Sequence, residues 1–145
     1  MKLPSGRVVT KTTSIYPGSN FTWAEVTKNL TRPISDLIIQ GKLYISDIEI
    51  EENIVEAAKK LDFYRKILGD RPLIVTSWYR PALVNQRVGG AKYSRHQYGD
   101  AIDILSNYKS PREIYSQLDS KHNKGGMGKY YGFVHIDFRG TKARW

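Results

Sequence analysis

The chain has 145 residues, of which 40% are hydrophobic and 26% charged, so it is long enough for one globular domain with its own core. It contains no cysteine, which excludes disulfides and cysteine metal sites, and no apolar run approaches the roughly 18–20 residues of a membrane span. Its 23 lysines and arginines outnumber 14 acids and give a net charge of +9. Such a charge favours a polyanionic partner, and nucleic acid, an anionic membrane surface and the bacterial cell wall all qualify.

The first half of the chain predicts two helices. Residues 1–20 are polar and read as an extension with one short strand at 7–10. Thr22 and Glu25 form the pattern of a capping box, which predicts a short helix that begins there. Residues 37–41 read as an apolar connector. From Ile50 to Leu68, apolar residues recur every three or four positions, which predicts a long amphipathic helix that belongs to the scaffold.

The second half predicts strands with turns and one helix between them. A capping box at Ser110, followed by proline, predicts a helix that runs to about Leu118. The glycines at 89–90 predict a tight turn, and those at 125–128 predict a flexible turn that either approaches a ligand or closes a hairpin. Alternating or apolar patterns predict strands at 72–77, 101–104 and 133–139.

The chemistry-bearing residues concentrate between Ser94 and His135. His96 and Asp103 lie seven residues apart, and on one helix they would be about 10 Å apart, too far to share a metal. Gly99 between them permits a turn, after which a strand could present Asp103 on the face opposite its isoleucines. A His on a loop could then fold back beside an Asp on a strand.

His135 lies in the last expected strand, where it shares a face with Asp137 while Val134 and Ile136 face the other way. Two imidazoles and one carboxylate suit Zn²⁺ and leave one coordination position open for water. We therefore put forward His96, Asp103 and His135 as ligands of one zinc ion. The pattern alone leaves an alternative open, in which they are a solvated loop residue, a turn acid and a hydrogen-bonded strand residue.

A set of motifs occurring in order narrows these alternatives. The motifs are Ser77-Trp78-Tyr79-Arg80, Asn85, Val88-Gly89-Gly90-Ala91, Ser94-x-His96-x-x-Gly99-x-Ala101-x-Asp103, Gly125-Gly126-x-Gly128-x-Tyr130 and Phe133-Val134-His135-Ile136-Asp137-x-Arg139-Gly140. Together they closely resemble the zinc D-alanyl-D-alanine carboxypeptidase family, whose relatives include the VanX and VanY peptidases and the hedgehog-type fold. The likeness covers roughly residues 21–145.

This resemblance implies an α+β fold, with a small antiparallel sheet that carries the zinc ligands and the long helix packed behind it. It implies an N-terminal extension over residues 1–20 and a single zinc peptidase domain over 21–145. Arg80, at a strand end beside a turn, is well placed to enter a cleft, and its guanidinium suits a carboxylate. The resemblance assigns it to the substrate or to the reacting carbonyl.

The general base is less clearly marked. Several relatives carry an acid three positions before the last zinc histidine, but Gly132 occupies that position here. Asp137 is the nearest acid and has three possible roles: the base, a partner that orients a ligand, or a metal ligand with His135 as the base.

Further residues receive provisional roles. Ser94 is either a structural turn residue, which we favour, or a hydrogen-bond donor to substrate. Tyr130 is one of several tyrosines suited to a peptide groove. His122, between lysines, reads as a solvated loop residue, and Trp145 as a residue that packs in the core.

The function we expect is a zinc-dependent peptidase that hydrolyses peptidoglycan stem peptides as a carboxypeptidase, dipeptidase or endopeptidase. The alternative is a non-catalytic basic module on the same scaffold, which docks on cell-wall polymer or nucleic acid. We expect the enzyme to be a monomer and to have no nucleic-acid partner. Because residues 1–6 lack the apolar block of a signal peptide, we expect it to be cytoplasmic as synthesised, or to reach the wall by another route.

Overall fold

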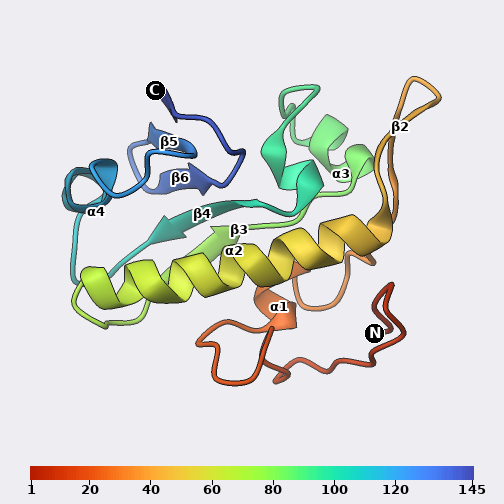
Figure 1. Ribbon diagram of the computed structural model, residues 1–145, viewed down its shortest axis with the longest axis horizontal. Helices are drawn as coiled ribbons and strands as arrows, with labels where there is room; N and C mark the ends of the chain where they lie inside the picture. Colours follow the sequence, from red (N-terminus) through yellow and green to blue (C-terminus); the bar gives the residue numbers. More distant parts are fainter.

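A five-stranded sheet and one long helix form the centre of the computed structural model, which describes residues 1–145 (Figure 1). Neighbouring strands are antiparallel except for β7, which runs parallel to β5. The architecture confirms the expected α+β class with a small, mainly antiparallel sheet. In sheet order the strands are β3 (Ile74–Ser77), β4 (Ala101–Leu105), β6 (Val134–Asp137), β5 (Gly126–Lys129) and β7 (Ala143–Arg144).

Helix α2 (Asp47–Ile67) is the long helix that the sequence predicts. It begins three residues earlier than the apolar pattern suggests, because the Ser46 side chain caps it by accepting a hydrogen bond from the Glu49 amide. Ile50 and Ile54 belong to its fully buried stripe. Figure 1 shows α2 running along the sheet. None of the helices has the length and apolarity needed to cross a membrane.

Alternation along the two central strands separates the core from the site. Ile102 and Ile104 of β4 and Ile136 of β6 are fully buried in the same core as the stripe of α2. Because successive side chains of a strand point to opposite faces, Asp103 and His135 point away from that core. The apolar residues of these strands therefore fix the orientation of the polar ones.

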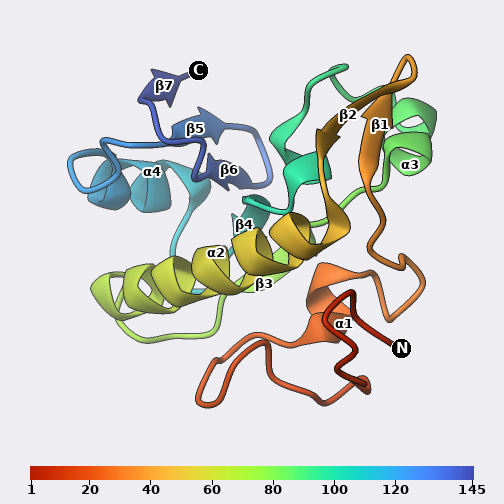
Figure 2. The same cartoon turned by 45° about the vertical axis from the view of Figure 1, so that its right-hand side comes forward.

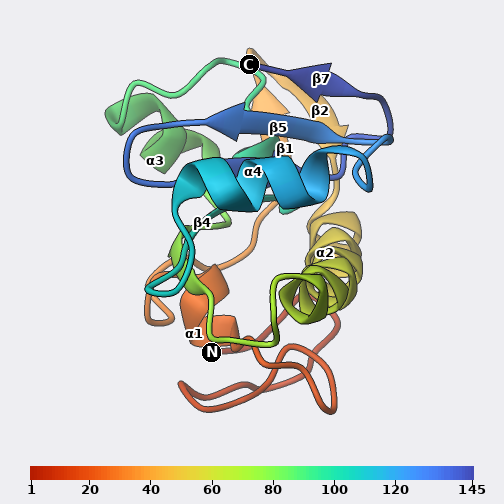
Figure 3. The same ribbon diagram turned by 90° about the vertical axis from the view of Figure 1, so that its left-hand side faces the viewer.

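Two short helices begin as their capping signals predict. Helix α1 (Trp23–Val26) has a complete capping box between Thr22 and Glu25. Helix α4 (Pro111–Asp119) has another, between Ser110 and Glu113. Figure 3 shows α4 lying against β5.

The expected connector at 37–41 is instead a hairpin of β1 (Leu37–Ile39) and β2 (Lys42–Ile45). Its two-residue turn consists of Gln40 and Gly41, both with positive φ angles, and a turn of this hand matches the twist of a hairpin. The sequence signal was present in Gly41, which we had read only as an end of the segment.

Three further expectations are corrected. The predicted strand at 7–10 is only an isolated bridge between Lys2 and Val8. The turn at Gly89 is preceded by a helix that we did not predict, α3 (Ala82–Arg87). Residues 126–128 belong to strand β5 and do not form a flexible turn. Glycine has a low strand propensity, so the tertiary setting overrides it here.

The first 20 residues pack on the rest of the chain. Leu3, Val9 and Ile15 are buried in the common core. The carboxylate of Asp62, on α2, accepts hydrogen bonds from the Tyr16 hydroxyl, the Ser19 hydroxyl and the Asn20 backbone and side chain, at 2.6–3.0 Å. Burial alone would raise the pKa of Asp62, but these hydrogen bonds outweigh it and lower the pKa. The division of the chain at residue 20 stays a prediction.

We predict that Asp62→Ala lowers the free energy of unfolding by about 1–3 kcal/mol, because it removes the common acceptor of four partly buried hydrogen bonds. The pKa of Asp62 is lowered in the folded protein, so its stabilisation should be present above about pH 4 and lost as the pH falls further. Urea unfolding of both proteins across this pH range measures the difference. Glu52→Ala, an exposed change on the same helix, should have little effect, and equal effects of the two would contradict the prediction.

Candidate metal centre

The site is built on one row of residues that crosses four strands. Gly128 of β5 pairs with His135 of β6, which pairs with Asp103 of β4, which pairs with Ser77 of β3. Directly opposed residues in antiparallel strands hold their side chains about 4.5–5.5 Å apart. The sheet register therefore brings together His135 and Asp103, which are 32 residues apart in the sequence.

His96 reaches this row from the short 3-10 helix η1 (Arg95–Tyr98). The Ser94 side chain caps η1 by accepting a hydrogen bond from the His96 amide at 3.3 Å, and Gly99 ends it with a φ of 80°. The turn expected at Gly99 is thus confirmed. The His96 carbonyl also accepts a 3.0 Å hydrogen bond from the Arg80 amide, which ties η1 to the segment after β3.

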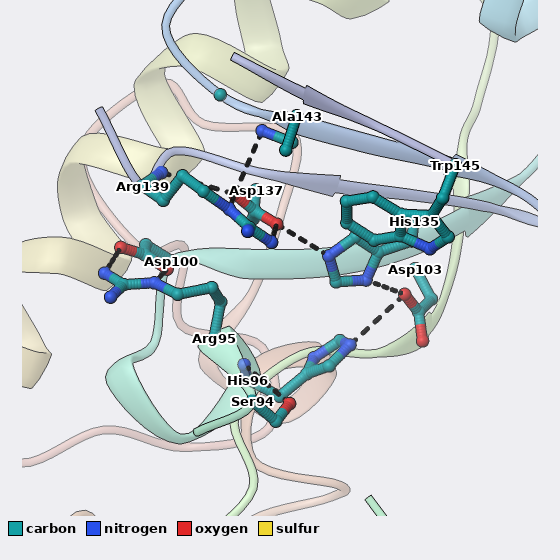
Figure 4. Close-up of polar contacts among 12 residues, drawn as sticks. Ser94, Arg95, His96, Asp100, Asp103, His135, Asp137, Arg139, Ala143 and Trp145 are labelled. Atoms are coloured by element: carbon teal, nitrogen blue, oxygen red, sulfur yellow. Dashed lines mark hydrogen bonds and ion pairs between the residues drawn. The ribbon is translucent and has the colours of Figure 1, made fainter. Parts of the chain in front are cut away.

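His96, Asp103 and His135 converge, as Figure 4 shows, and their potential ligand atoms all lie within 4.8 Å of one another. All three are at least nine-tenths buried. Metal bonds of about 2.0–2.2 Å place donor atoms up to about 4 Å apart across an ion. Small side-chain rotations would therefore allow the three groups to share one ion.

Each histidine is oriented by a hydrogen bond at the ring nitrogen that faces away from the convergence point. Nδ1 of His96 lies 2.7 Å from the Trp78 carbonyl, to which it can only donate. Nε2 of His135 lies 2.9 Å from the carboxylate of Asp137. These contacts leave Nε2 of His96 and Nδ1 of His135 directed at Oδ1 of Asp103, at 3.2 and 2.9 Å. A carboxylate or carbonyl behind the ring is the usual arrangement of a metal-binding histidine.

The electrostatics favour a positive charge between these groups. Burial acts to raise the pKa of Asp103, but hydrogen bonds with His135 and His96 outweigh it and lower the pKa to about 2. Burial acts to lower the pKa of His135, but Asp103 and Asp137 outweigh it and raise the pKa. A proton on His135 supplies this positive charge. A divalent metal ion could take its place, because metal binding displaces protons from histidine ligands.

Asp137 lies behind His135, away from the cavity. Its carboxylate is fully buried and accepts hydrogen bonds from His135, from the Gly126 amide, and from the amide and guanidinium of Arg139, at 2.7–3.3 Å. Burial would raise the pKa of Asp137, but Arg139 and His135 outweigh it and lower the pKa strongly. Arg139 is a residue that the sequence alone does not mark as functional, although its two-residue spacing from Asp137 would place both side chains on one face of a strand.

A cavity of about 630 Å³ opens over the three converging residues. Arg80 lines it, with Nη2 3.6 Å from Oδ2 of Asp103 and Nε held by the Ser77 hydroxyl at 3.2 Å. Ser94 and Tyr130 line it as well. Asp103 is the only carboxylate among the lining residues, because Asp137 is covered and the exposed Gly132 offers none.

One wall of the cavity is aromatic, and Trp145 belongs to it. We expected Trp145 in the core, but it is 47% exposed, its ring centroid lies 5.2 Å from that of His135, and Nε1 donates to the Tyr130 hydroxyl at 2.9 Å. Tyr130 stacks on Phe133 at 4.6 Å between centroids. A Cβ atom at position 128 would lie 2.3 Å from Nε1 of Trp145, so a larger residue there would displace the Trp145 ring. No local pattern marks Trp145, because its place depends on β7 pairing with β5.

The expectation for His122 is also corrected. It is buried, with Nδ1 2.8 Å from the Tyr64 hydroxyl and Nε2 2.7 Å from the Asp137 carbonyl. Burial lowers the pKa of His122, so the neutral ring donates from Nε2 and accepts from Tyr64. His122 lies outside the converging group and supports the backbone of Asp137. The flanking lysines favour an exposed position, so the sequence does not indicate that His122 is buried.

Comparison with known proteins agrees with this arrangement. The family model described as Peptidase M15 matches residues 20–137, which contain all three converging residues. The chain is similar to a zinc D-Ala-D-Ala carboxypeptidase of Streptomyces albus G, with 39% identity over 85 residues. That match covers 59% of this chain and 31% of the relative, so this chain aligns with about a third of the length of the relative.

We predict that Asp137→Asn lowers the affinity for Zn²⁺ about tenfold or more, because the neutral amide loses the ion pair with Arg139 and no longer fixes the His135 ring. Competition with a chromophoric chelator would measure the affinity. Arg87→Gln, an exposed change on α3, should leave it unchanged. An unaltered affinity in a folded Asp137→Asn protein would show that Asp137 does not orient a ligand.

Proposed function

Because this chain belongs to the peptidase M15 family, we propose that it is a zinc-dependent peptidase acting on the stem peptides of peptidoglycan. The observation that carries the proposal is the convergence of His96, Asp103 and His135 beneath an open cavity. The name of the Streptomyces relative supports zinc as the ion and a peptide with D-alanine as the substrate class.

The residues present fit one zinc ion. Two imidazole nitrogens and one carboxylate oxygen are a donor set that zinc accepts, and the donors face the cavity, where a substrate could approach. When bound there, zinc would supply Lewis-acid polarisation of the scissile carbonyl and would acidify a water molecule.

Arg80 is our candidate for stabilising the negative charge that develops on the carbonyl oxygen. Its guanidinium lines the cavity beside Asp103 and is only partly exposed. The Ser77 and Asn85 side chains accept hydrogen bonds from it at 3.2 and 3.4 Å, and so restrict its orientation. A preoriented cation of this kind stabilises a developing oxyanion, and it could also hold a substrate carboxylate.

For Asp137, the geometry favours the second of the three roles considered above. A fully buried carboxylate that accepts several hydrogen bonds has no path to a water molecule in the cavity. We therefore propose that Asp137 positions His135 and holds the proton of its Nε2.

Ser94 and Tyr130 have different supporting observations. The hydroxyl of Ser94 caps η1, which supports a structural role in presenting His96. The Tyr130 hydroxyl accepts a hydrogen bond from Trp145 and lies at the cavity wall, which supports contact with substrate.

The open cavity could accommodate either the end or the middle of a peptide, so both carboxypeptidase-like and endopeptidase-like cleavage are compatible with it. We propose that the cleavage takes place at the cell wall and that the enzyme acts as a monomer.

A second candidate function is a basic binding module that docks on wall polymer without turnover. One observation favours it: apart from Asp103, no carboxylate lines the cavity to act as a general base. Metal content and turnover decide between the two.

We predict that the purified protein binds one Zn²⁺ ion and releases peptide or D-alanine from peptidoglycan, and that His96→Ala removes both properties. Metal analysis and chromatography of the released products measure them. Chelation should abolish release, and added Zn²⁺ should restore it. A metal-free protein that binds wall polymer without cleaving it would instead establish the binding module.

We also predict that Arg80→Ala lowers kcat about 10²- to 10³-fold while zinc content stays unchanged, because an oxyanion donor is lost. Steady-state kinetics on a short peptide ending in D-Ala-D-Ala would measure this. Arg87→Ala, at the exposed end of α3, serves as the control for charge. An increase in KM alone would show that Arg80 binds substrate and does not stabilise the transition state.

A further inference from the structure

Four cationic side chains line the cavity over the metal centre, and three of them are already paired with acids of this chain. The three pairs are Arg80 with Asp103, Arg95 with Asp100, and Arg139 with Asp137. The fourth cation, Lys92, has no acidic side chain within ion-pair distance and is exposed. Lys92 is therefore the one cationic side chain of this cavity lining that has no acidic partner in the chain.

The surroundings of Lys92 hold its ammonium group at the cavity rim. Nζ donates a 2.8 Å hydrogen bond to the side chain of Gln40, in the β1–β2 turn, and lies 5.4 Å from the centre of the Tyr93 ring. An ammonium group has three N–H donors, so this contact leaves two for a ligand.

A second basic residue strengthens the local positive potential. Lys42 lies over the Tyr44 ring at 5.2 Å, and the hydroxyl of Tyr44 donates to that of Tyr93 at 3.4 Å. The pKa of Tyr93 is lowered by this hydrogen bond and by the charges of Lys92 and Lys42. Two lysines and two tyrosines thus form one basic, aromatic cluster, of which Lys92 and Tyr93 line the metal cavity.

Lys92 also marks the junction of two cavities. A second cavity of about 460 Å³ lies between the β1–β2 hairpin and α3, which Figure 2 shows standing side by side. It shares Gly90 and Lys92 with the metal cavity. Its lining combines apolar residues with the amide side chains of Gln40, Asn85, Gln86 and Gln97, a chemistry suited to a peptide chain.

We propose that Lys92 determines specificity by binding a carboxylate of the substrate peptide, outside the amide that reacts, while the adjoining chain enters the second cavity. This inference rests on the proposed peptidase function and adds a charge requirement to it. Because Arg95 and Arg139 are each paired with an acid of the chain and Arg80 is assigned to the reacting carbonyl, Lys92 is the cation of this cavity that remains for a substrate anion outside the reacting amide.

The test uses synthetic peptide substrates in matched acid and amide forms. One pair differs only at the C-terminus, and the other only at a side-chain carboxyl. We expect the wild type to prefer the acid form of one pair, which identifies the carboxylate that Lys92 binds. In Lys92→Gln, the ratio of kcat/KM for that acid to its amide should fall about three- to tenfold, the effect of one charged contact in an open groove.

Two further variants separate charge recognition from structure. Lys92→Arg keeps the cation and should retain most of the preference. Lys66→Gln, an exposed lysine of α2 that lines neither cavity, removes the same charge and should leave the ratio unchanged. If Lys92→Gln changes the acid and amide rates equally in both pairs, or changes neither, the inference is wrong.

Calorimetric binding of the same peptides to the zinc-loaded protein distinguishes failure of this inference from failure of the proposed function. If the wild type cleaves nothing but binds the acid form more tightly through Lys92, only the peptidase function is lost. If binding shows no acid preference that depends on Lys92, the inference falls whether or not the protein cleaves peptides.

Discussion

The cross-strand pairing of Asp103 with His135 is the constraint on which the site depends. A slip of one residue in the β4–β6 register would turn one of the two side chains into the core and bring an isoleucine or valine to the cavity. The register is secured by the apolar residues on the other face, since Ile102, Ile104 and Ile136 are fully buried against the stripe of α2. The long helix thus contributes to metal-site geometry without a ligand of its own, because it determines which face of each strand is buried.

Successive layers of contacts then hold the two imidazoles in place. The Trp78 carbonyl orients His96, and Asp137 orients His135. Asp137 is itself held by Arg139 on its side chain, while His122 supports its carbonyl and connects it to Tyr64 of α2. Two of the three histidines thus converge with Asp103 beneath the cavity, and the third supports the strand behind them.

The sequence predicted those parts of the fold that depend on local patterns. The capping boxes at Thr22 and Ser110, the stripe of α2 and the alternation around Asp103 and His135 follow from neighbours in the chain, and the structure has each of them. Trp145 and His122 could not be placed in this way. One owes its position to β7 pairing with a distant strand, and the other to burial beneath a polar loop. Strand β5 could not be predicted from strand propensity, because its glycines are explained by close packing. A Cβ atom at Gly126 would meet the Asp137 side chain, and one at Gly128 would meet the Trp145 ring.

The converging residues and the surrounding cavity walls lie on different segments of the chain, and this has an evolutionary consequence. The converging residues sit on the central strands and on η1, whereas much of the remaining cavity lining comes from residues 90–95, the β5–β6 connection and Trp145, and the β1–β2 hairpin lines the adjoining second cavity (Figure 2). Surface hairpins tolerate insertions and exchanges of sequence far better than buried strands do. Lineages that share this scaffold could therefore change which ligands they accept by remodelling these surface segments, with no change in the converging residues beneath them.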